Sequence, residues 1–290
     1  MNGILIVNKP KQYTSHDVVA KVKKICGEKV GHTGTLDPMA TGVLPLLIGQ
    51  GTKLSKYLIN HDKIYVSTIQ LGKKTDTLDS EGNIIEEKAI DIKLLNKENV
   101  QKVLDFQKGK QTQTPPIYSA IKVNGKKLYE YARKGVEVEI PKREIEIYNI
   151  ELLNINEKDK TIEFKVHCSK GTYIRTLCEN IAENLGTIGY MKELNRVQVG
   201  QFNLSQSVTI EELEQNKENE KFWNQHLITI QKFFENYPII DLKKEKLNLF
   251  LNGVQLTNNN NDGLYQIKVN NTIIGVGNIK NKLLKREIIY

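Results

Sequence analysis

Cysteine is scarce in this chain of 290 residues, where only Cys26, Cys168 and Cys178 occur. Their number is odd, and they show neither a CxxC pair nor the cysteine–histidine spacing of a zinc site. We therefore expect reduced cysteines in the core, without a disulfide framework or a bound metal. A redox or nucleophilic cysteine is the alternative interpretation, and it requires a thiol that ionises easily.

Long hydrophobic runs are also missing. No apolar stretch approaches the roughly 18 residues of a membrane-spanning helix. Residues 1–7 have neither the basic region nor the long apolar core of a secretory signal. We therefore expect a cytoplasmic protein with no membrane association. The GxGxxG and phosphate-loop patterns are absent too, so the sequence indicates no cofactor.

Acidic residues are outnumbered, with 34 Asp and Glu against 42 Lys and Arg, a net charge of +8. Such a surplus favours a polyanionic partner without proving one. Residues 1–60 hold eight lysines against three acids, and residues 108–134 hold seven basic residues against one acid. Tyr118, Tyr129 and Tyr131 lie within the second segment. Since basic groups bind phosphates and aromatic rings stack on unpaired bases, this segment predicts RNA binding, with a solvated basic loop as the alternative.

Hydrophobic periodicity divides the chain into short elements. The apolar runs and alternating segments predict strands at residues 4–8, 43–48, 64–71, 136–140, 144–154 and 162–167. The i, i+3, i+4 spacing predicts helices at residues 15–26, 97–107 and 172–185. Ser15 is expected to cap the first of these helices, and Thr52 a further short one. Residues 112–126, which include Pro115-Pro116, are expected to be irregular.

The composition changes after about residue 205. Five glutamates between residues 211 and 220 indicate a solvent-facing helical stretch. After Pro238, short apolar segments alternate with glycines and an asparagine-rich turn, which indicates a small β-rich unit. We therefore expect one larger domain over residues 1–230, with an insertion at about 108–135, and a second domain over residues 236–290.

Asp37 lies in an unusual loop, GHTGTLDPMATG over residues 31–42. Pro38 biases the preceding aspartate toward an extended backbone, which restricts where its carboxylate points. The apolar neighbours Leu36 and Met39 would exclude water, which makes a carboxylate more nucleophilic but disfavours its charge. A nucleophilic aspartate here would need a cation beside it. An ordinary Asp-Pro turn is the alternative interpretation.

Arg175 is the candidate cation. It stands at the start of the helix expected at residues 172–185, where a positive charge opposes the helix dipole and costs roughly 0.3–1 kcal/mol. It lies off the apolar stripe of that helix, so packing does not explain it. A local rule broken without local compensation indicates a functional site, although a surface arginine is the alternative.

Two further residues have open roles on sequence alone. His32 precedes Asp37 in the same loop and could be a general base, a stacking partner for a flipped base or a hydrogen-bonding loop residue. Tyr65 lies in an expected strand, so it is a core residue unless its ring faces the Asp37 loop.

Together these residues resemble the bacterial tRNA uridine-55 pseudouridine synthases of the TruB family. Residues 31–42 look like the family's nucleophile motif, and Asn8-Lys9-Pro10 with Thr14-Ser15 is similar to its N-terminal motif. Residues 62–65 and 168–175 match the segments that contribute an active-site tyrosine and arginine, and residues 113–120 begin what looks like an RNA-gripping insertion. The resemblance covers about residues 3–200 in order.

The resemblance implies a mixed α/β (α+β) pseudouridine synthase fold. Its central sheet would be mainly antiparallel and flanked by helices, and the C-terminal β-rich domain would be PUA-like. Residues 1–230 would then be the catalytic domain. Lys11-Gln12 and Asn195 depart from the family pattern and concern details of RNA contact.

The resemblance also implies roles. Asp37 would be the nucleophile, acting at C1′ or C6 or on a 2′ proton, with Arg175 keeping it ionised. Tyr65 would hold the uracil and assist removal of its C5 proton, and His32 would fill the place of extruded bases. Substrate contacts would also come from Lys9, Pro10, Tyr118, Lys122, Tyr173, Leu194 and Arg196. The expected partner is the T-arm stem-loop of tRNA, bound by a monomer that needs no other protein, metal or cofactor.

The sequence leaves three alternatives open. A non-catalytic RNA-binding protein of the same fold is disfavoured by the joint presence of Asp37, Tyr65 and Arg175. A guide-directed enzyme acting on rRNA is disfavoured by the bacterial-like insertion. A hydrolase using Asp37 as a covalent nucleophile on a sugar would require a second carboxylate, for which Asp76 or Asp79 stays open.

Overall fold

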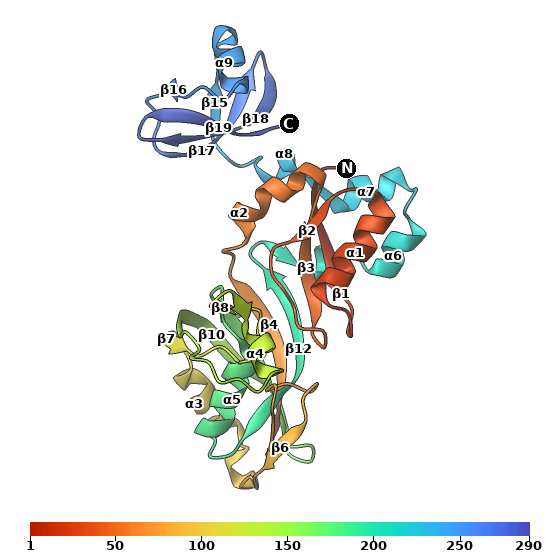
Figure 1. Ribbon diagram of the computed structural model, residues 1–290, viewed down its shortest axis with the longest axis vertical. Coiled ribbons are helices and arrows are strands. Elements are labelled where there is room, and N and C mark those ends of the chain that lie inside the picture. Colours follow the sequence, from red (N-terminus) through yellow and green to blue (C-terminus); the bar gives the residue numbers. More distant parts are fainter.

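The computed structural model describes residues 1–290, which form an elongated molecule with a small β-rich unit at one end (Figure 1). A ten-stranded sheet has the order β14-β1-β3-β12-β4-β11-β10-β7, with β2 paired to β3 and β13 to β12. Its strands are β1 (Gly3–Lys9), β2 (Val30–His32), β3 (Thr41–Ile48), β4 (Lys63–Leu71), β7 (Gly109–Gln113), β10 (Arg143–Asn156), β11 (Thr161–Cys168), β12 (Gly189–Val199), β13 (Phe202–Asn203) and β14 (Leu227–Thr229). The helices are α1 (Ser15–Cys26), α2 (Ser55–Leu58), α3 (Lys97–Phe106), α4 (Leu128–Ala132), α5 (Ile174–Asn184), α6 (Ile210–Gln215), α7 (Glu220–His226), α8 (Ile230–Phe233) and α9 (Leu247–Leu251).

The sheet consists of two halves joined by a short parallel contact. Strands β3 and β12 pair in parallel over only two positions, Asn195 with Thr41 and Arg196 with Gly42, while the other neighbours are antiparallel. Gly42 has φ +110°, and a Cβ there would collide with Arg196, whose amide nitrogen would lie 2.8 Å away. Only glycine lets the two strands approach this closely.

Strand β1 is a continuous apolar run because both of its faces are buried. Ile4 and Ile6 lie in one apolar cluster, with α2 and α8, and Leu5 and Val7 lie in another, with α1, α6 and α7. The other half of the sheet is covered on one face by α3 and α5, over a core of 24 buried residues. The first half is thus a three-layer structure and the second a two-layer one, with the Asp37 loop where they meet.

A second, five-stranded sheet has the order β15-β17-β18-β19-β16 and its own core of eight buried residues. Its strands are β15 (Ile239–Asp241), β16 (Leu256–Thr257), β17 (Gly263–Val269), β18 (Thr272–Lys280) and β19 (Leu283–Ile289). Val276 and Ile288 of this unit are buried in the same cluster as Ile4 and Leu58. The second sheet is therefore packed against the first half of the central sheet. None of the helices combines the length and apolar composition needed to cross a membrane.

Most elements expected from periodicity are confirmed, but several local predictions are wrong. Thr14, not Ser15, caps α1, through a capping box with Asp17. Thr52 lies inside a 3₁₀ turn over Gly49–Leu54 and caps no helix. Residues 136–140 form no strand, because no neighbouring strand pairs with them.

The segment expected to be irregular, residues 112–126, contains regular structure. Strand β7 extends to Gln113, and a small hairpin forms between β8 (Lys122–Val123) and β9 (Lys126–Lys127). Asn124 and Gly125 both have positive φ at its turn. An Asn-Gly pair is a strong hairpin signal, and it was available in the sequence. The acidic stretch forms two short helices, α6 and α7, in place of one.

Candidate active site

The loop between β2 and β3 carries Asp37, and hydrogen bonds hold the loop backbone in place. The Leu36 amide donates to Ser15 Oγ at 2.9 Å, and Ser15 Oγ donates back to the Leu36 carbonyl at 3.3 Å. Ser15 is fully buried, so these bonds are shielded from water. On the other side of Asp37, the Pro38 carbonyl accepts from the Gln12 amide at 2.8 Å. The start of α1 and the turn before it therefore hold the backbone on both sides of the aspartate.

Lys9, expected from the resemblance to contact the substrate, lies inside the protein. Its side chain is buried, and its Nζ donates to the carbonyls of Pro10, Tyr13 and Pro38 at 2.5–3.1 Å. Burial lowers the pKa of Lys9 to about 8, against the opposing charges of Asp37 and Glu81. The buried ammonium group thus links the N-terminal motif to the Asp37 loop through hydrogen bonds. Pro10 is half-buried and contributes its carbonyl to this arrangement.

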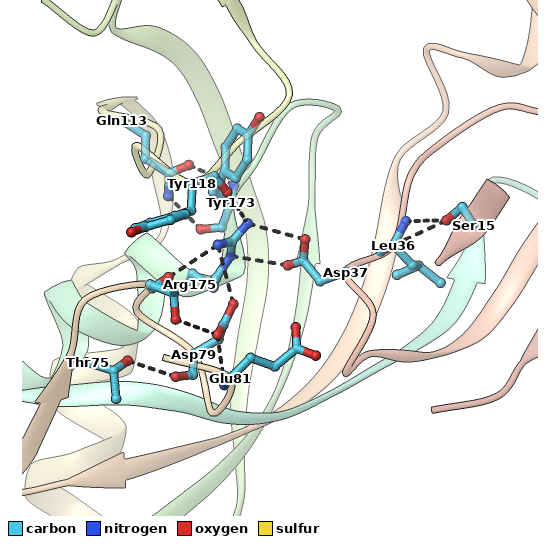
Figure 2. Close-up of polar contacts among 11 residues, drawn as sticks. Ser15, Leu36, Asp37, Thr75, Asp79, Glu81, Gln113, Tyr118, Tyr173 and Arg175 are labelled. Carbon is cyan, nitrogen blue, oxygen red and sulfur yellow. Dashed lines mark hydrogen bonds and ion pairs between the residues drawn. The ribbon is translucent and has the colours of Figure 1, made fainter. Parts of the chain in front are cut away.

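Asp37 and Arg175 meet in a two-pronged ion pair, as Figure 2 shows. Arg175 Nε lies 3.1 Å from Asp37 Oδ2, and Nη2 donates to Asp37 Oδ1 at 3.2 Å. The arginine side chain is 7% exposed and the aspartate 31% exposed. The guanidinium is therefore buried, whereas part of the Asp37 side chain is exposed to solvent. The alternative interpretation of Arg175 as a surface arginine is excluded, and Asp37 differs from an ordinary Asp-Pro turn in having a buried cationic partner.

The remaining guanidinium hydrogens of Arg175 are also bonded. Nη1 donates to the Thr77 carbonyl at 3.2 Å and faces Asp79 Oδ2 at 3.4 Å, while Nη2 also donates to the Tyr118 carbonyl at 3.0 Å. A buried arginine needs such complete pairing, because desolvating its charge is costly. These partners stabilise the positive charge of Arg175, which is unfavourable in the first turn of α5.

Asp79 was missed by sequence reasoning, which treated it only as a turn residue or as a possible second carboxylate of a hydrolase. It is 5% exposed, and its Oδ1 accepts from Thr77 Oγ1 at 2.6 Å and from the Glu81 amide at 3.0 Å. Thr75 Oγ1 donates to its carbonyl at 2.7 Å. The turn thus presents a fixed carboxylate to Arg175. No local pattern separates this carboxylate from an ordinary Asp-rich turn.

Burial raises the pKa of Asp37 above its ordinary value. The Arg175 guanidinium opposes this shift, the Asp79 carboxylate adds to it, and the more distant charges of Lys9 and Arg196 oppose it. A carboxylate that is partly desolvated yet paired with a cation suits nucleophilic or proton-transfer chemistry.

The apolar residues near Asp37 in its loop belong to the core of the second half-sheet. Tyr65 on β4 and Leu194 on β12 are buried in the same cluster as Leu36 and Met39 of the Asp37 loop. Tyr65 therefore belongs to the core that also contains part of the Asp37 loop, and the charge of Asp37 acts on its phenol group. Burial raises the pKa of Tyr65 to about 12, with Arg196 opposing the shift.

Arg196, also expected from the resemblance to contact the substrate, is likewise buried. It is 1% exposed, and it donates from Nε to the Val43 carbonyl at 2.8 Å and from Nη2 to the Gly34 carbonyl at 3.1 Å. These bonds connect β12 to both ends of the Asp37 loop. Arg196 is therefore a structural support under the loop in this fold.

The insertion reaches the site through its backbone. Tyr118 contributes its carbonyl to Arg175, and the amide side chain of the buried Gln113 forms two bonds with the backbone of Tyr173, at 2.8 and 3.1 Å. These two bonds hold the backbone of Tyr173, the residue immediately before α5. Gln113 was not identified from sequence. Lys122 lies on the β8–β9 hairpin with its side chain exposed.

His32 lies at the end of β2 and packs edge-on against His16, with 5.4 Å between ring centroids. Its Nδ1 is buried without a hydrogen-bond partner. Burial, together with His16, lowers the pKa of His32, so the neutral imidazole is favoured. His16 was not identified from sequence either.

Comparison with known proteins agrees with this arrangement. The profile described as "TruB family pseudouridylate synthase (N terminal domain)" matches residues 21–174, and "tRNA pseudouridylate synthase B C-terminal domain" matches residues 175–235. The tRNA pseudouridine synthase B of Clostridium kluyveri is 43% identical over 285 residues, covering 96% of this chain and 95% of the relative. That of Caldanaerobacter subterraneus subsp. tengcongensis is 42% identical over 294 residues, covering 100% and 99%.

A solved structure described as a Cbf5-Nop10-Gar1 complex shares the fold with a TM-score of 0.70 at 25% identity, covering 99% of this chain and 84% of that one. Its likeness extends through the central sheet and the C-terminal unit. The first profile alone spans more than half of the sequence, and it includes the Asp37 loop, Tyr65 and Asp79. The chain therefore belongs to the TruB family and is a pseudouridine synthase, an isomerase.

Proposed function

We propose that this enzyme isomerises uridine 55 in the T-loop of tRNA, with Asp37 as the nucleophile and the target nucleotide flipped out of the loop. The observation that carries the proposal is the two-pronged Arg175–Asp37 pair, whose aspartate is partly exposed and whose loop packs in the same core cluster as Tyr65 and Leu194. Similar proteins named tRNA pseudouridine synthase B support tRNA as the substrate.

The reaction breaks the bond between N1 of uracil and C1′ of ribose, turns the base and forms a bond between C5 and C1′. One proton leaves C5 and one joins N1, so no oxidant or energy source is consumed. Whether the first step is attack at C1′, attack at C6 or removal of the 2′ proton, it requires an ionised carboxylate in contact with the nucleotide. Asp37 meets this requirement because Arg175 opposes the effect of burial on its charge.

Arg175 also restricts the geometry of the nucleophile. A guanidinium that bonds both carboxylate oxygens sets the carboxylate plane as well as its position. Since Arg175 is itself bonded to Asp79 and to two carbonyls, the pair is organised before substrate arrives. Preorganisation of this kind reduces the barrier without reorganisation during the reaction.

The uracil would lie between Tyr65 and Leu194. Flipping a base out of its stack costs a few kcal/mol, and stacking on an aromatic ring returns roughly 1–3 kcal/mol. Both side chains are almost fully buried, at 8% and 7% exposure. Their exposed edges would be covered by the base. His32 would occupy the position of extruded bases in the RNA loop.

The basic insertion would bind the RNA backbone. Lys122 and Lys126 are exposed on the β8–β9 hairpin, and Tyr129 lies between Lys127 and Arg133, each 5.3 Å from its ring centroid. We further propose that residues 1–230 are the catalytic domain and residues 236–290 an additional RNA-binding domain.

The test is incubation of the purified protein alone with an unmodified T-arm stem-loop, followed by mapping of pseudouridine at nucleotide resolution. Wild type should convert only the uridine at position 55, and it should need neither a guide RNA nor a second protein. Asp37→Asn should form no product. Asp105→Asn, which changes an exposed aspartate on α3, is the matched control and should retain wild-type turnover.

Two results would overturn the proposal. Product from Asp37→Asn would remove the nucleophile assignment. Conversion only after addition of a guide RNA or a partner protein would indicate an assembly of the kind named in the similar solved complex.

A further inference from the structure

Arg196 faces Tyr65 across two neighbouring strands. The two residues are direct partners in the antiparallel pairing of β12 with β4, and Leu194 pairs with Ser67 two positions further along. Directly opposed residues in an antiparallel pair project to the same face of the sheet, with their Cβ atoms about 4.5–5.5 Å apart. Side chains two positions apart on one strand share that face. Arg196 and Leu194 therefore lie side by side on the face of the sheet that carries Tyr65.

The Asp37 loop uses only part of the hydrogen-bonding capacity of the Arg196 guanidinium. Nε donates to the Val43 carbonyl and Nη2 to the Gly34 carbonyl, at 2.8 and 3.1 Å. The side chain is 1% exposed, and a buried cation is costly unless its donors are satisfied. The Tyr65 hydroxyl supplies a further acceptor, since Arg196 and Tyr65 act on each other through charge and through side-chain hydrogen bonding.

The charged and titratable groups around Tyr65 act on its phenol in opposite directions. They are Arg196 on β12, Cys168 at the end of β11 and Asp37 in the loop. Burial raises the pKa of Tyr65 to about 12, and Cys168 and Asp37 add to this shift. Arg196 opposes it, both by its charge and by its N–H groups. Arg196 is therefore the cation that favours the phenolate form of Tyr65.

The phenolate form matters for the reaction proposed above. The family resemblance implies that Tyr65 assists removal of the C5 proton once C5 has bonded to C1′. In that step the phenolate oxygen takes the proton, and the electron pair of the C5–H bond forms the C5=C6 double bond. The phenol later releases a proton to water, while N1 gains one from solvent. A guanidinium beside the phenol favours the charged form, which is the form that accepts the proton.

We propose that Arg196 is a positioning residue for this proton transfer, which holds the Tyr65 oxygen in place and stabilises its negative charge. The inference rests on the proposed function. The same guanidinium bonds the carbonyls of Gly34 and Val43, on either side of Asp37 in the sequence. Tyr65 and the Asp37 loop thus share one buried support. The proton acceptor and the nucleophile therefore keep a fixed relation to each other before the RNA binds.

The experiment measures the kinetics of isomerisation of unmodified tRNA that carries protium or deuterium at uridine C5. Arg196→Gln removes the charge but keeps a side-chain amide donor. We expect kcat to fall by roughly 10²-fold with KM nearly unchanged, because a proton-transfer step is impaired and RNA binding is not. Since C5 deprotonation is the step that slows, the deuterium isotope effect on kcat should exceed that of wild type. Lys165→Gln, which removes an exposed cation from β11, is the matched control and should behave as wild type.

A fluorinated tyrosine separates an effect on the phenol from a structural role. Fluorine on the ring lowers the pKa of a phenol, so 3,5-difluorotyrosine in place of Tyr65 offsets the loss of the guanidinium. It should restore part of the activity of Arg196→Gln near neutral pH and reduce the isotope effect again. Arg196→Lys is the second variant. A lysine keeps the charge but has a single donor group, so it should retain more activity than Arg196→Gln and should also gain from the fluorinated ring.

The inference is overturned if Arg196→Gln keeps wild-type kcat, if kcat falls without a larger isotope effect, or if neither variant responds to the fluorinated ring. Failure of both variants to fold, measured by urea denaturation, would assign Arg196 to structure alone and would also overturn it. The proposed function is tested separately. A wrong assignment of uridine 55 would appear only in the map of pseudouridine, and a wrong nucleophile only in the activity of Asp37→Asn.

Discussion

Arg175 and Asp37 are 138 residues apart in sequence, yet their side chains meet through two contacts of 3.1 and 3.2 Å. The loop that carries Asp37 belongs to one half of the central sheet, and α5, which carries Arg175, covers the other half. Closing the two halves therefore assembles the ion pair. The geometry of this ion pair therefore depends on the folding of the sheet.

Arg175→Lys tests the two-pronged geometry. A lysine keeps the positive charge but offers a single point of contact, so the plane of the Asp37 carboxylate is no longer restricted. We expect kcat/KM for uridine isomerisation to fall by roughly 10²-fold, as misplacement of a reacting group does elsewhere. Arg286→Lys, in the C-terminal unit, is the control and should behave as wild type. Equal activity of Arg175→Lys and wild type would contradict the requirement for a guanidinium.

The pH dependence tests the electrostatics of Asp37. Burial raises its pKa, so the single-turnover rate should fall as the pH decreases through a midpoint above the ordinary aspartate value of about 3.9. Asp79→Asn removes a negative charge that raises the pKa of Asp37, so the midpoint should move to lower pH.

Asp76→Asn controls for this change. It alters the same turn, where Asp76 accepts only the Asn83 amide at 2.9 Å, and it should leave the midpoint in place. An unchanged midpoint in Asp79→Asn, or the same shift in both variants, would show that the Asp79 charge does not act on Asp37.

Gly42→Ala tests the junction of the two half-sheets. A Cβ at this position would collide with the backbone of Arg196, and φ +110° strains any other residue. We expect a loss of about 3 kcal/mol or more in the free energy of unfolding, with loss of isomerase activity. Gly27→Ala is the control, because Gly27 has φ +68° and nothing near its Cβ position. Similar losses in the two variants, measured by urea denaturation, would mean that backbone strain alone explains the effect.

Lys122→Ala and Lys126→Ala test whether the insertion binds the phosphates of the RNA. Each should weaken RNA binding and lower the slope of log affinity against log salt by about 1, because one phosphate contact is lost. Fluorescence anisotropy with a labelled T-arm stem-loop at several salt concentrations gives that slope. Lys158→Ala and Lys221→Ala change exposed lysines elsewhere and should leave it unaltered. A slope that stays constant in all four variants would place the phosphate contacts outside the hairpin.

Local elements were accessible from sequence because they depend on neighbouring residues. The period of apolar residues predicted α1, α3 and α5, and β1, β4, β10 and β11 followed from short apolar runs and alternation. The predictions of local structure were wrong where the interacting residues lie far away in the sequence. Residues 136–140 have strand-like alternation but find no strand to pair with. Ser15 was expected as a cap because serine suits that position, whereas its hydroxyl is used by Leu36, 21 residues away.

The site was only partly accessible for the same reason. Asp37, Tyr65 and Arg175 carry recognisable motifs, and the unfavourable position of Arg175 at a helix start indicated a distant partner. Asp79 and Gln113 had no such signal, because an aspartate in a turn and a glutamine near prolines are ordinary. Lys9 and Arg196 were expected to contact the substrate on the basis of the family resemblance.

The sequence by itself determined the chemical groups available to this protein: a carboxylate in a glycine-rich loop, a cation at a helix start and a basic insertion with aromatic residues. Only the tertiary structure decided which of the charged groups are buried and which residues they pair with. It buried Lys9 and Arg196 on backbone carbonyls and placed Arg175 between Asp37 and Asp79. The physical reason is that periodicity and turn preferences act over a few residues, whereas desolvation and the pairing of buried charges depend on which distant segments pack together.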